Sequence, residues 1–203
     1  MPRPKYQKDD ERAREKLIRA FWDGIGDMPF HKLTVTEVIR RAGLNRNSFY
    51  YHFECIDDMA EKVVEETLMR DLPGILVSEL NNGSHSTVDF LLSDKGLRER
   101  FDHVCLLAGK NSSPQLQEML KTAIADNWKS FLSIETGKLS HEDRLVFEFC
   151  LGGVLSLLAY RADDKMNPPI RDMFSTDFGK AALMSIAKLG KKIAGTGELV
   201  FQK

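Results

Sequence analysis

Residues 33–59 read LTVTEVIRRAGLNRNSFYYHFECIDDM, and this stretch decides the fold of the chain. Thr34 is a favourable N-cap, and Glu37 three residues later completes a capping-box pattern, which predicts a short helix beginning there. Gly43 supplies the left-handed residue that ends this helix. Asn45 is the N-cap of a second short helix. The stretch is therefore predicted to form two helices joined by a tight turn.

The second helix, which we expect to end near Phe53, has two different faces. Phe49 and Phe53 are spaced i, i+4 and point together toward the core. The opposite face carries four side chains that would be exposed: Arg46, Asn47, Tyr50 and Tyr51. Arg and Asn pair bidentately with guanine and adenine edges, and Tyr hydroxyls reach phosphates. Two helices joined by a Gly-containing turn form the DNA-binding helix-turn-helix, so we predict double-stranded DNA as a partner.

The order of these residues resembles the TetR family of transcriptional regulators, which is typified by the tetracycline repressor. The matching pieces fall within about residues 10–68 and are Leu33-Thr-Val35, Ile39, Ala42-Gly-Leu44, Ser48-Phe-Tyr-Tyr-His-Phe53 and a helix starting near Asp57. The resemblance implies an all-α protein. It would have an N-terminal three-helix helix-turn-helix head and a C-terminal helical body for ligand binding and dimerisation.

One position departs from the family pattern. The family often has a Lys three residues after the Phe that closes the recognition helix, and this chain has Ile56 there. The acidic residues Glu54 and Asp57 flank it. A usual phosphate contact is therefore missing from the start of the fourth helix.

The DNA-contacting residues follow from the helix faces and from the resemblance together. Arg46 and Asn47 would contact bases of a near-palindromic operator. The remaining residues expected at the DNA lie on the second helix or at the start of either helix: Thr34, Thr36, Asn45, Ser48, Tyr50, Tyr51 and His52.

Composition sets the broad class of the protein. The chain has 203 residues, of which 42% are hydrophobic and 29% charged, as in an ordinary globular protein. Its net charge is −1, and the charge is unevenly distributed along the chain: residues 1–53 carry +4 and residues 54–203 carry −5. A basic end on an acidic body fits one DNA-facing end, although ordinary charge fluctuation produces the same imbalance.

We expect two domains, the head (residues 1–56) and the body (residues 57–203), joined by a helix that starts near residue 57. In the head, a helix over residues 9–25 should follow a flexible basic arm of residues 1–8. In the body, the helix from residue 57 is interrupted at Pro73-Gly74. Further body helices are predicted over residues 97–107, 115–134, 142–161 and 177–193.

The helix over residues 142–161 is apolar almost all round and must be covered on every face. The resemblance implies that it dimerises together with the helix over 177–193, as a four-helix bundle with their symmetry mates. The alternative is that both helices only form the core of one monomer.

The resemblance also implies a small-molecule effector pocket in the body. Its candidate lining residues are aromatic, Met or His side chains: His103, Met119, Trp128, Phe131, Phe147 and Tyr160, with Cys105 beside them. Each of these residue types is also usual in a plain hydrophobic core. His103 in particular suits a structural histidine.

Cellular location is indicated by three cysteines and by the N-terminus. Cys55, Cys105 and Cys150 are far apart and odd in number, so we expect no disulfide framework or zinc site and a reducing cytoplasm. The N-terminus has no apolar signal segment, and the longest nearly apolar run, residues 149–160, is shorter than a membrane span. We therefore expect a cytoplasmic protein with no membrane partner.

The predicted function is a dimeric, ligand-responsive transcriptional regulator, most simply a repressor. An alternative is a protein of the same fold that acts as a co-regulator through a protein partner, which Ile56 and the acids Glu54, Asp57 and Asp58 favour. No catalytic, metal-binding or cofactor-binding pattern occurs in the sequence, so we expect no enzyme activity, no metal and no cofactor.

Overall fold

The computed structural model describes residues 5–68, 94–131 and 139–166, together with the single positions 172, 177, 181 and 184. Within these ranges the chain forms seven α-helices and one short 3-10 helix, without a β-strand, which confirms the all-α fold class. The elements are α1 (Lys5–Asp27), η1 (Phe30–Lys32), α2 (Val35–Ala42), α3 (Arg46–His52), α4 (Ile56–Leu68), α7 (Lys95–Ala108), α8 (Pro114–Phe131) and α9 (His141–Asp163).

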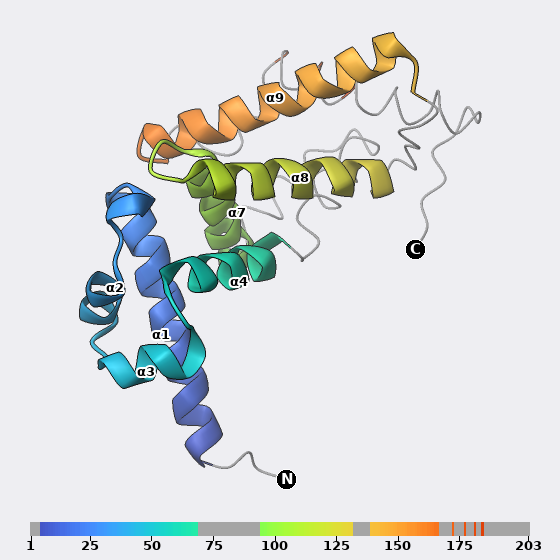
Figure 1. Ribbon diagram of the computed structural model, residues 1–203. Helices are drawn as coiled ribbons and strands as arrows, with labels where there is room; N and C mark the ends of the chain where they lie inside the picture. Colours follow the sequence, from blue (N-terminus) through green and yellow to red (C-terminus); the bar gives the residue numbers. More distant parts are fainter. Residues whose placement is uncertain are drawn as a thin grey trace.

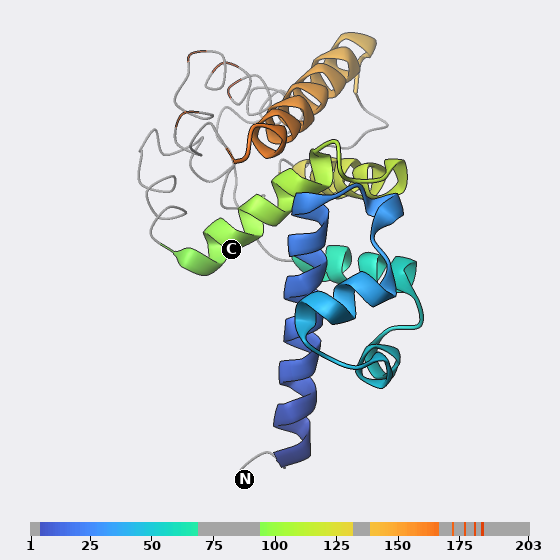
Figure 2. The ribbon, with the colours of Figure 1, turned by 90° about the vertical axis from the view of Figure 1, so that its left-hand side faces the viewer.

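The helices of the head gather around α1. Figure 1 shows α2 and α3 beside α1, with α9 at the opposite end of the molecule and α8 between α9 and α4. Figure 2, turned by 90°, shows that the first turns of α1 extend beyond α2 and α3. Helix α1 packs against α2, α3 and α7, so it belongs to the head and also contacts the body.

The predicted helix ends of the head are formed by the expected side chains. The Glu37 N–H donates to Thr34 Oγ1 (3.2 Å), and the Ser48 N–H donates to Asn45 Oδ1 (2.9 Å). Gly43 has φ of 64°, the left-handed conformation that its place after α2 requires. These local signals therefore fix where α2 and α3 begin and where α2 ends.

Two predictions for the head are wrong in part. The Glu37 carboxylate does not complete the capping box, because it binds the guanidinium groups of Arg40 and Arg41, which are stronger partners than a backbone N–H. Residues 5–8 are not a flexible arm but the first residues of α1. No Gly or Pro lies between Pro4 and Gly24, so the helix propagates back to the last proline.

The core runs without a break from the head into the body. Leu17, Phe21 and Ile25 of α1 are fully buried, and so is Phe49 of α3. Trp22, which the sequence did not single out, is also buried. The buried side of α1 is therefore wide, since a large aromatic side chain beside Phe21 is buried as well.

Trp22 meets the body through His103 of α7. The two rings are stacked, with centroids 4.2 Å apart and an angle of 5° between their planes. His103 thus joins α1 to α7, as expected for a structural histidine. Burial disfavours its charged form and lowers its pKa to about 4, against an ordinary 6.5; Glu99 acts in the opposite direction and Arg100 in the same one.

The body helices match their predicted ranges within a few residues. The Asp143 N–H donates to Ser140 Oγ (3.1 Å), so the predicted cap of α9 is formed. Helix α9 is held against α7 by an ion pair between Arg161 and Asp102 (2.9 Å), and Arg161 is itself buried. The predicted break at Pro73-Gly74 and nearly all of the helix over 177–193 lie outside the described residues.

Helix α9 has a buried and an exposed apolar face. Phe147, Leu151 and Leu158 are buried, whereas Leu145 and Phe149 are 59% and 70% exposed. We expected every face of α9 to be covered by other residues. The part of the chain that the structure describes leaves this apolar face exposed. The judgement that the apolar run is too short for a membrane is also wrong, since α9 is long and apolar enough to cross one by length and composition. The apolar window of α9 is longer than residues 149–160.

We predict that His103 makes the folded protein sensitive to mild acid. The unfolded chain takes up a proton at His103 below about pH 6.5, while the folded protein does not until about pH 4. The stability that comes from neutral, folded His103 is therefore present above pH 6.5 and is lost as the pH falls toward 4. Between pH 7 and 4.5, wild type should lose about 2 kcal/mol more free energy of unfolding than His103→Phe, which keeps an aromatic ring but does not titrate. Urea denaturation at both pH values measures this, and equal losses would contradict it.

The cap of α3 gives a second prediction. Replacing Asn45 by Ala should lower the free energy of unfolding by about 1 kcal/mol, because the Ser48 N–H loses its acceptor. Asn47→Ala, two residues further along α3, is the matched control and should change the stability by less than about 0.5 kcal/mol. Thermal and urea denaturation would reveal the difference, and equal effects of the two substitutions would show that the cap is unimportant.

Candidate nucleic-acid interface

Helices α2 and α3 form a helix-turn-helix through a tight turn. The Gly43 N–H donates to the carbonyl of Arg40 (3.3 Å), and the Leu44 N–H donates to the carbonyl of Ile39 (3.1 Å). These bonds use the last carbonyls of α2 and turn the chain toward Asn45, where α3 begins. The path of the chain from α2 into the turn is thus fixed by backbone bonds at Gly43 and Leu44.

The outward side of α3 forms the reading face, which we define as Arg46, Asn47, Tyr50 and Tyr51. All four side chains are exposed, Tyr50 by 48% and Tyr51 by 70%. Phe49 and Phe53 on the other side are buried, as predicted. A helix that leaves two tyrosines in water while burying two phenylalanines presents a fixed polar surface to a partner.

Arg46 and Tyr50 form a pair on the reading face. Arg46 Nη2 donates to the Tyr50 hydroxyl (3.3 Å), and the guanidinium carbon lies 5.6 Å from the centre of the Tyr50 ring. Stacking on an aromatic ring limits the rotamers of a long Arg side chain. The guanidinium is therefore held partly in place before any base or phosphate binds.

Three other predicted contacts have a structural role as well. Thr34 Oγ1 accepts the Glu37 N–H, and the Asn45 side-chain oxygen accepts both the N–H and the hydroxyl of Ser48. In Asn45 the side-chain NH2 is the group left for a phosphate. Thr36, in the first turn of α2, is exposed.

His52 closes α3 and is partly buried. Burial lowers its pKa below the ordinary value, Asp10 acts in the opposite direction, and Arg14 adds to the lowering. The lowered pKa favours the neutral imidazole, whose N–H can donate to a phosphate without adding a full positive charge. His52 also meets the Tyr51 ring edge to face, with centroids 4.9 Å apart.

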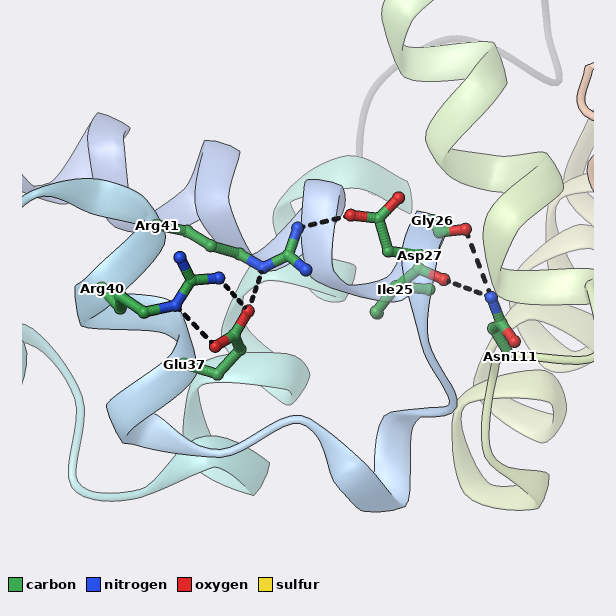
Figure 3. Close-up of polar contacts among 7 residues, drawn as sticks. All are labelled: Ile25, Gly26, Asp27, Glu37, Arg40, Arg41 and Asn111. Carbon is green, nitrogen blue, oxygen red and sulfur yellow. Dashed lines mark hydrogen bonds and ion pairs between the residues drawn. The ribbon is translucent and has the colours of Figure 1, made fainter.

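A charged network fixes α2 to the end of α1 (Figure 3). The Glu37 carboxylate accepts bonds from Arg40 (2.6 and 2.9 Å) and Arg41 (2.7 Å), and Arg41 also binds Asp27 of α1 (2.6 Å). The guanidinium of Arg40 first, and then that of Arg41, lowers the pKa of Glu37 to about 2. The sequence analysis did not predict this network, because Asp27 lies fourteen positions before Arg41 and no local pattern joins them.

The acids that follow α3 are partly used inside the protein. Asp58 accepts the Glu54 N–H (2.9 Å) and binds Lys62 (2.8 Å), and both contacts lower its pKa, that of Lys62 more strongly. Asp58 therefore acts as a cap at the start of α4. Ile56 is the first residue of α4 and is half-buried against the core. A Lys at this position could pack its aliphatic stem there, but its charged end would stay in water.

Among the described residues, the side chains predicted for an effector pocket do not all line one cavity. Trp128 of α8 and Phe147 of α9 are buried and meet edge to face, with centroids 5.9 Å apart. His103 lies apart from them against Trp22, and Tyr160 is 59% exposed. Met119 and Cys105 belong to the core or pack against it, and the side chain of Phe131 lies outside the described residues.

A cavity of about 590 Å³ opens between α8 and α9. Its apolar lining comprises Ala125, Leu139, Phe147 and Leu151, and its charged lining comprises Glu118, Lys121, Asp126, Lys129, Arg144 and Glu148. Phe147 is the one predicted pocket residue in this lining. In the described ranges, no three His, Cys, Asp or Glu side chains are grouped so that they could hold a metal ion.

Comparison with known families agrees with this geometry. Residues 23–63 match the family model described as bacterial regulatory proteins, tetR family. The matched stretch starts in the last turns of α1, contains α2 and α3, and ends within α4. No curated protein matches the chain. The match covers the helix-turn-helix and its exposed reading face, and it supports a DNA-binding transcriptional regulator of the TetR family.

Proposed function

We propose that this protein is a homodimeric, ligand-responsive repressor that acts in the cytoplasm on a near-palindromic operator. Arg46 and Asn47 contact base edges in the major groove, and the remaining predicted residues bind phosphates around them. The observation that carries the proposal is the exposed reading face on a capped and buried α3. A dimer places two such helices about one DNA turn apart.

The proposed dimer is supported by the exposed apolar face of α9. Leu145 and Phe149 lie four residues apart and are both largely exposed. In the part of the chain that the structure describes, a Cβ added at Gly152 or Gly153 would meet nothing within 4 Å, which leaves room there for a second helix. Burying such a surface against a second copy would remove it from water.

The proposed effector response is supported by the cavity between α8 and α9. Its volume of about 590 Å³ suits a small molecule, and its floor includes Phe147 and Leu151. Because α9 is also the proposed dimer helix, an effector there would alter the relation of the two subunits. A coupling of about 1–3 kcal/mol between effector and operator would be typical.

A co-regulator that contacts another protein is the second candidate, and it has weaker support. It is favoured by Ile56 and by the acidic start of α4, but Asp58 is engaged with Lys62 and with the Glu54 N–H. Glu54 and Asp57 remain exposed. The absence of any DNA binding at low salt would favour this candidate.

The first test of DNA recognition removes Arg46. Selection from genomic fragments with purified protein supplies the operator. Arg46→Ala should then weaken operator binding by about 1–3 kcal/mol and reduce the preference over random DNA, because a bidentate base contact is lost. Arg98→Ala, which removes an exposed Arg from α7, is the control and should bind like wild type. Unchanged affinity of Arg46→Ala for both DNAs would refute the assignment.

The test of the dimer replaces Phe149 by Glu. A charge in an apolar interface, and the loss of a Phe worth about 1.5–3 kcal/mol of burial, should weaken dimerisation at least about tenfold. Sedimentation velocity over a concentration series measures this, and circular dichroism checks the helix content. Glu142→Gln, at an exposed position in the first turn of α9, should sediment like wild type. If Phe149→Glu sediments as wild type does, α9 is not the dimer interface.

A further inference from the structure

The turn between α7 and α8 (residues 109–113) holds the end of α1 through Asn111. The Asn111 side-chain NH2 donates to the carbonyls of Ile25 (3.0 Å) and Gly26 (3.3 Å), as Figure 3 shows. These carbonyls belong to the last turn of α1, where helical partners are missing. The Asn111 carbonyl accepts the N–H of Phe30 (2.7 Å). One residue of the body therefore binds the head on both sides of the bend between α1 and η1.

The same turn is fixed to α9 on its other side. The Lys110 N–H donates to Asp163 Oδ1 (2.9 Å). A Cβ added at Gly109 would lie 3.0 Å from the Ala162 Cβ and 3.1 Å from Asp163 Oδ1, so the turn approaches α9 about as closely as glycine permits. The turn is thus in direct contact with the end of α9 and with the end of α1.

On the head side, the end of α1 is tied to the helix-turn-helix. Asp27 follows Gly26 directly and binds Arg41 of α2, which shares Glu37 with Arg40. A further contact runs from Gln115 of α8 to Glu61 of α4 (2.9 Å), the helix that joins the head to the body. Asn111 is therefore one of the contacts that set the direction of α2 and α3 relative to α9, beside the buried contact of Trp22 with His103.

We propose that Asn111 is a positioning residue that fixes the angle of the head against α9, and thereby the half-site spacing that the dimer accepts. The inference rests on the proposed function, because a preferred half-site spacing exists only for a dimer that binds DNA with two heads. In a dimer built on α9, any rotation of the head about the end of α1 changes the separation of the two reading faces. Half-sites lie about 34–36 Å apart on DNA, and each base pair added between them rotates one half-site relative to the other.

The test compares operators that differ only in the spacing of their half-sites. Asn111→Asp keeps the shape of the side chain but removes the NH2 donor, and Asn111→Ala removes the donor without adding a charge. Gln117→Glu is the matched control: Gln117 also donates through its NH2 to two carbonyls, those of Ala108 and Gly109 (both 3.3 Å), but both lie in the body. Dissociation constants are measured for the selected operator and for versions shortened or lengthened by one and two base pairs.

Wild type and Gln117→Glu should prefer one spacing clearly. In both Asn111 variants, the ratio of affinities between the preferred spacing and its neighbours should fall at least fivefold, while binding to the best site falls less. A uniform loss at all spacings would indicate a merely structural role and would overturn the inference. Profiles identical to that of wild type would overturn it as well.

A second measurement does not depend on DNA. Cys55 follows α3 and is exposed, whereas Cys105 and Cys150 are buried, so a thiol-reactive spin label attaches to the head alone. The distribution of distances between the two labels of a dimer should be broader in Asn111→Asp than in wild type and Gln117→Glu. If wild type binds no DNA, the proposed function fails. The width of the distance distribution still tests whether Asn111 fixes the angle of the head. Equal widths, or a wild type that is monomeric, would overturn it.

Discussion

The structure depends on the C-terminal half of α1, which contributes to two hydrophobic surfaces at once. Leu17, Phe21 and Ile25 are fully buried, and Trp22 is buried against His103 of the body. A Cβ at Gly24 would lie 2.6 Å from Leu33 Cδ1, so the glycine allows the segment before α2 to approach α1 closely. Head and body thus share a helix, and a displacement of α1 moves the surfaces that both of them pack against.

This arrangement explains how a recognition helix of seven residues is held. So short a helix is unstable in water by itself, because the cost of nucleation exceeds what a few hydrogen bonds return. The Asn45 cap satisfies its first turn, and Phe49 and Phe53 bury its inner side. With α3 fixed in this way, Tyr50 and Tyr51 can stay exposed without loosening the helix.

Charge in the head is used locally rather than as a broad field. Glu37 and Asp27 bind the guanidinium groups of α2. Asp58 binds Lys62 and accepts a backbone N–H. Arg46 has only the Tyr50 hydroxyl and ring as its described contacts. The charge at the reading face is therefore concentrated in one side chain, Arg46.

The sequence by itself determined the helix-turn-helix, its two caps, the left-handed Gly43 and the inner and outer faces of α3. Each of these depends on residues within about four positions of one another, and helical geometry relates such residues directly. It also identified the ranges of α7, α8 and α9 through apolar periodicity. It could not find the contacts of Asn111, Trp22 or Asp27. Asn111 lies 86 positions from Ile25, and a partner at that separation is chosen only when α1, α7 and α9 pack together. Tertiary structure alone decided how the head is attached to the body, because that attachment is made of pairs that no local pattern relates.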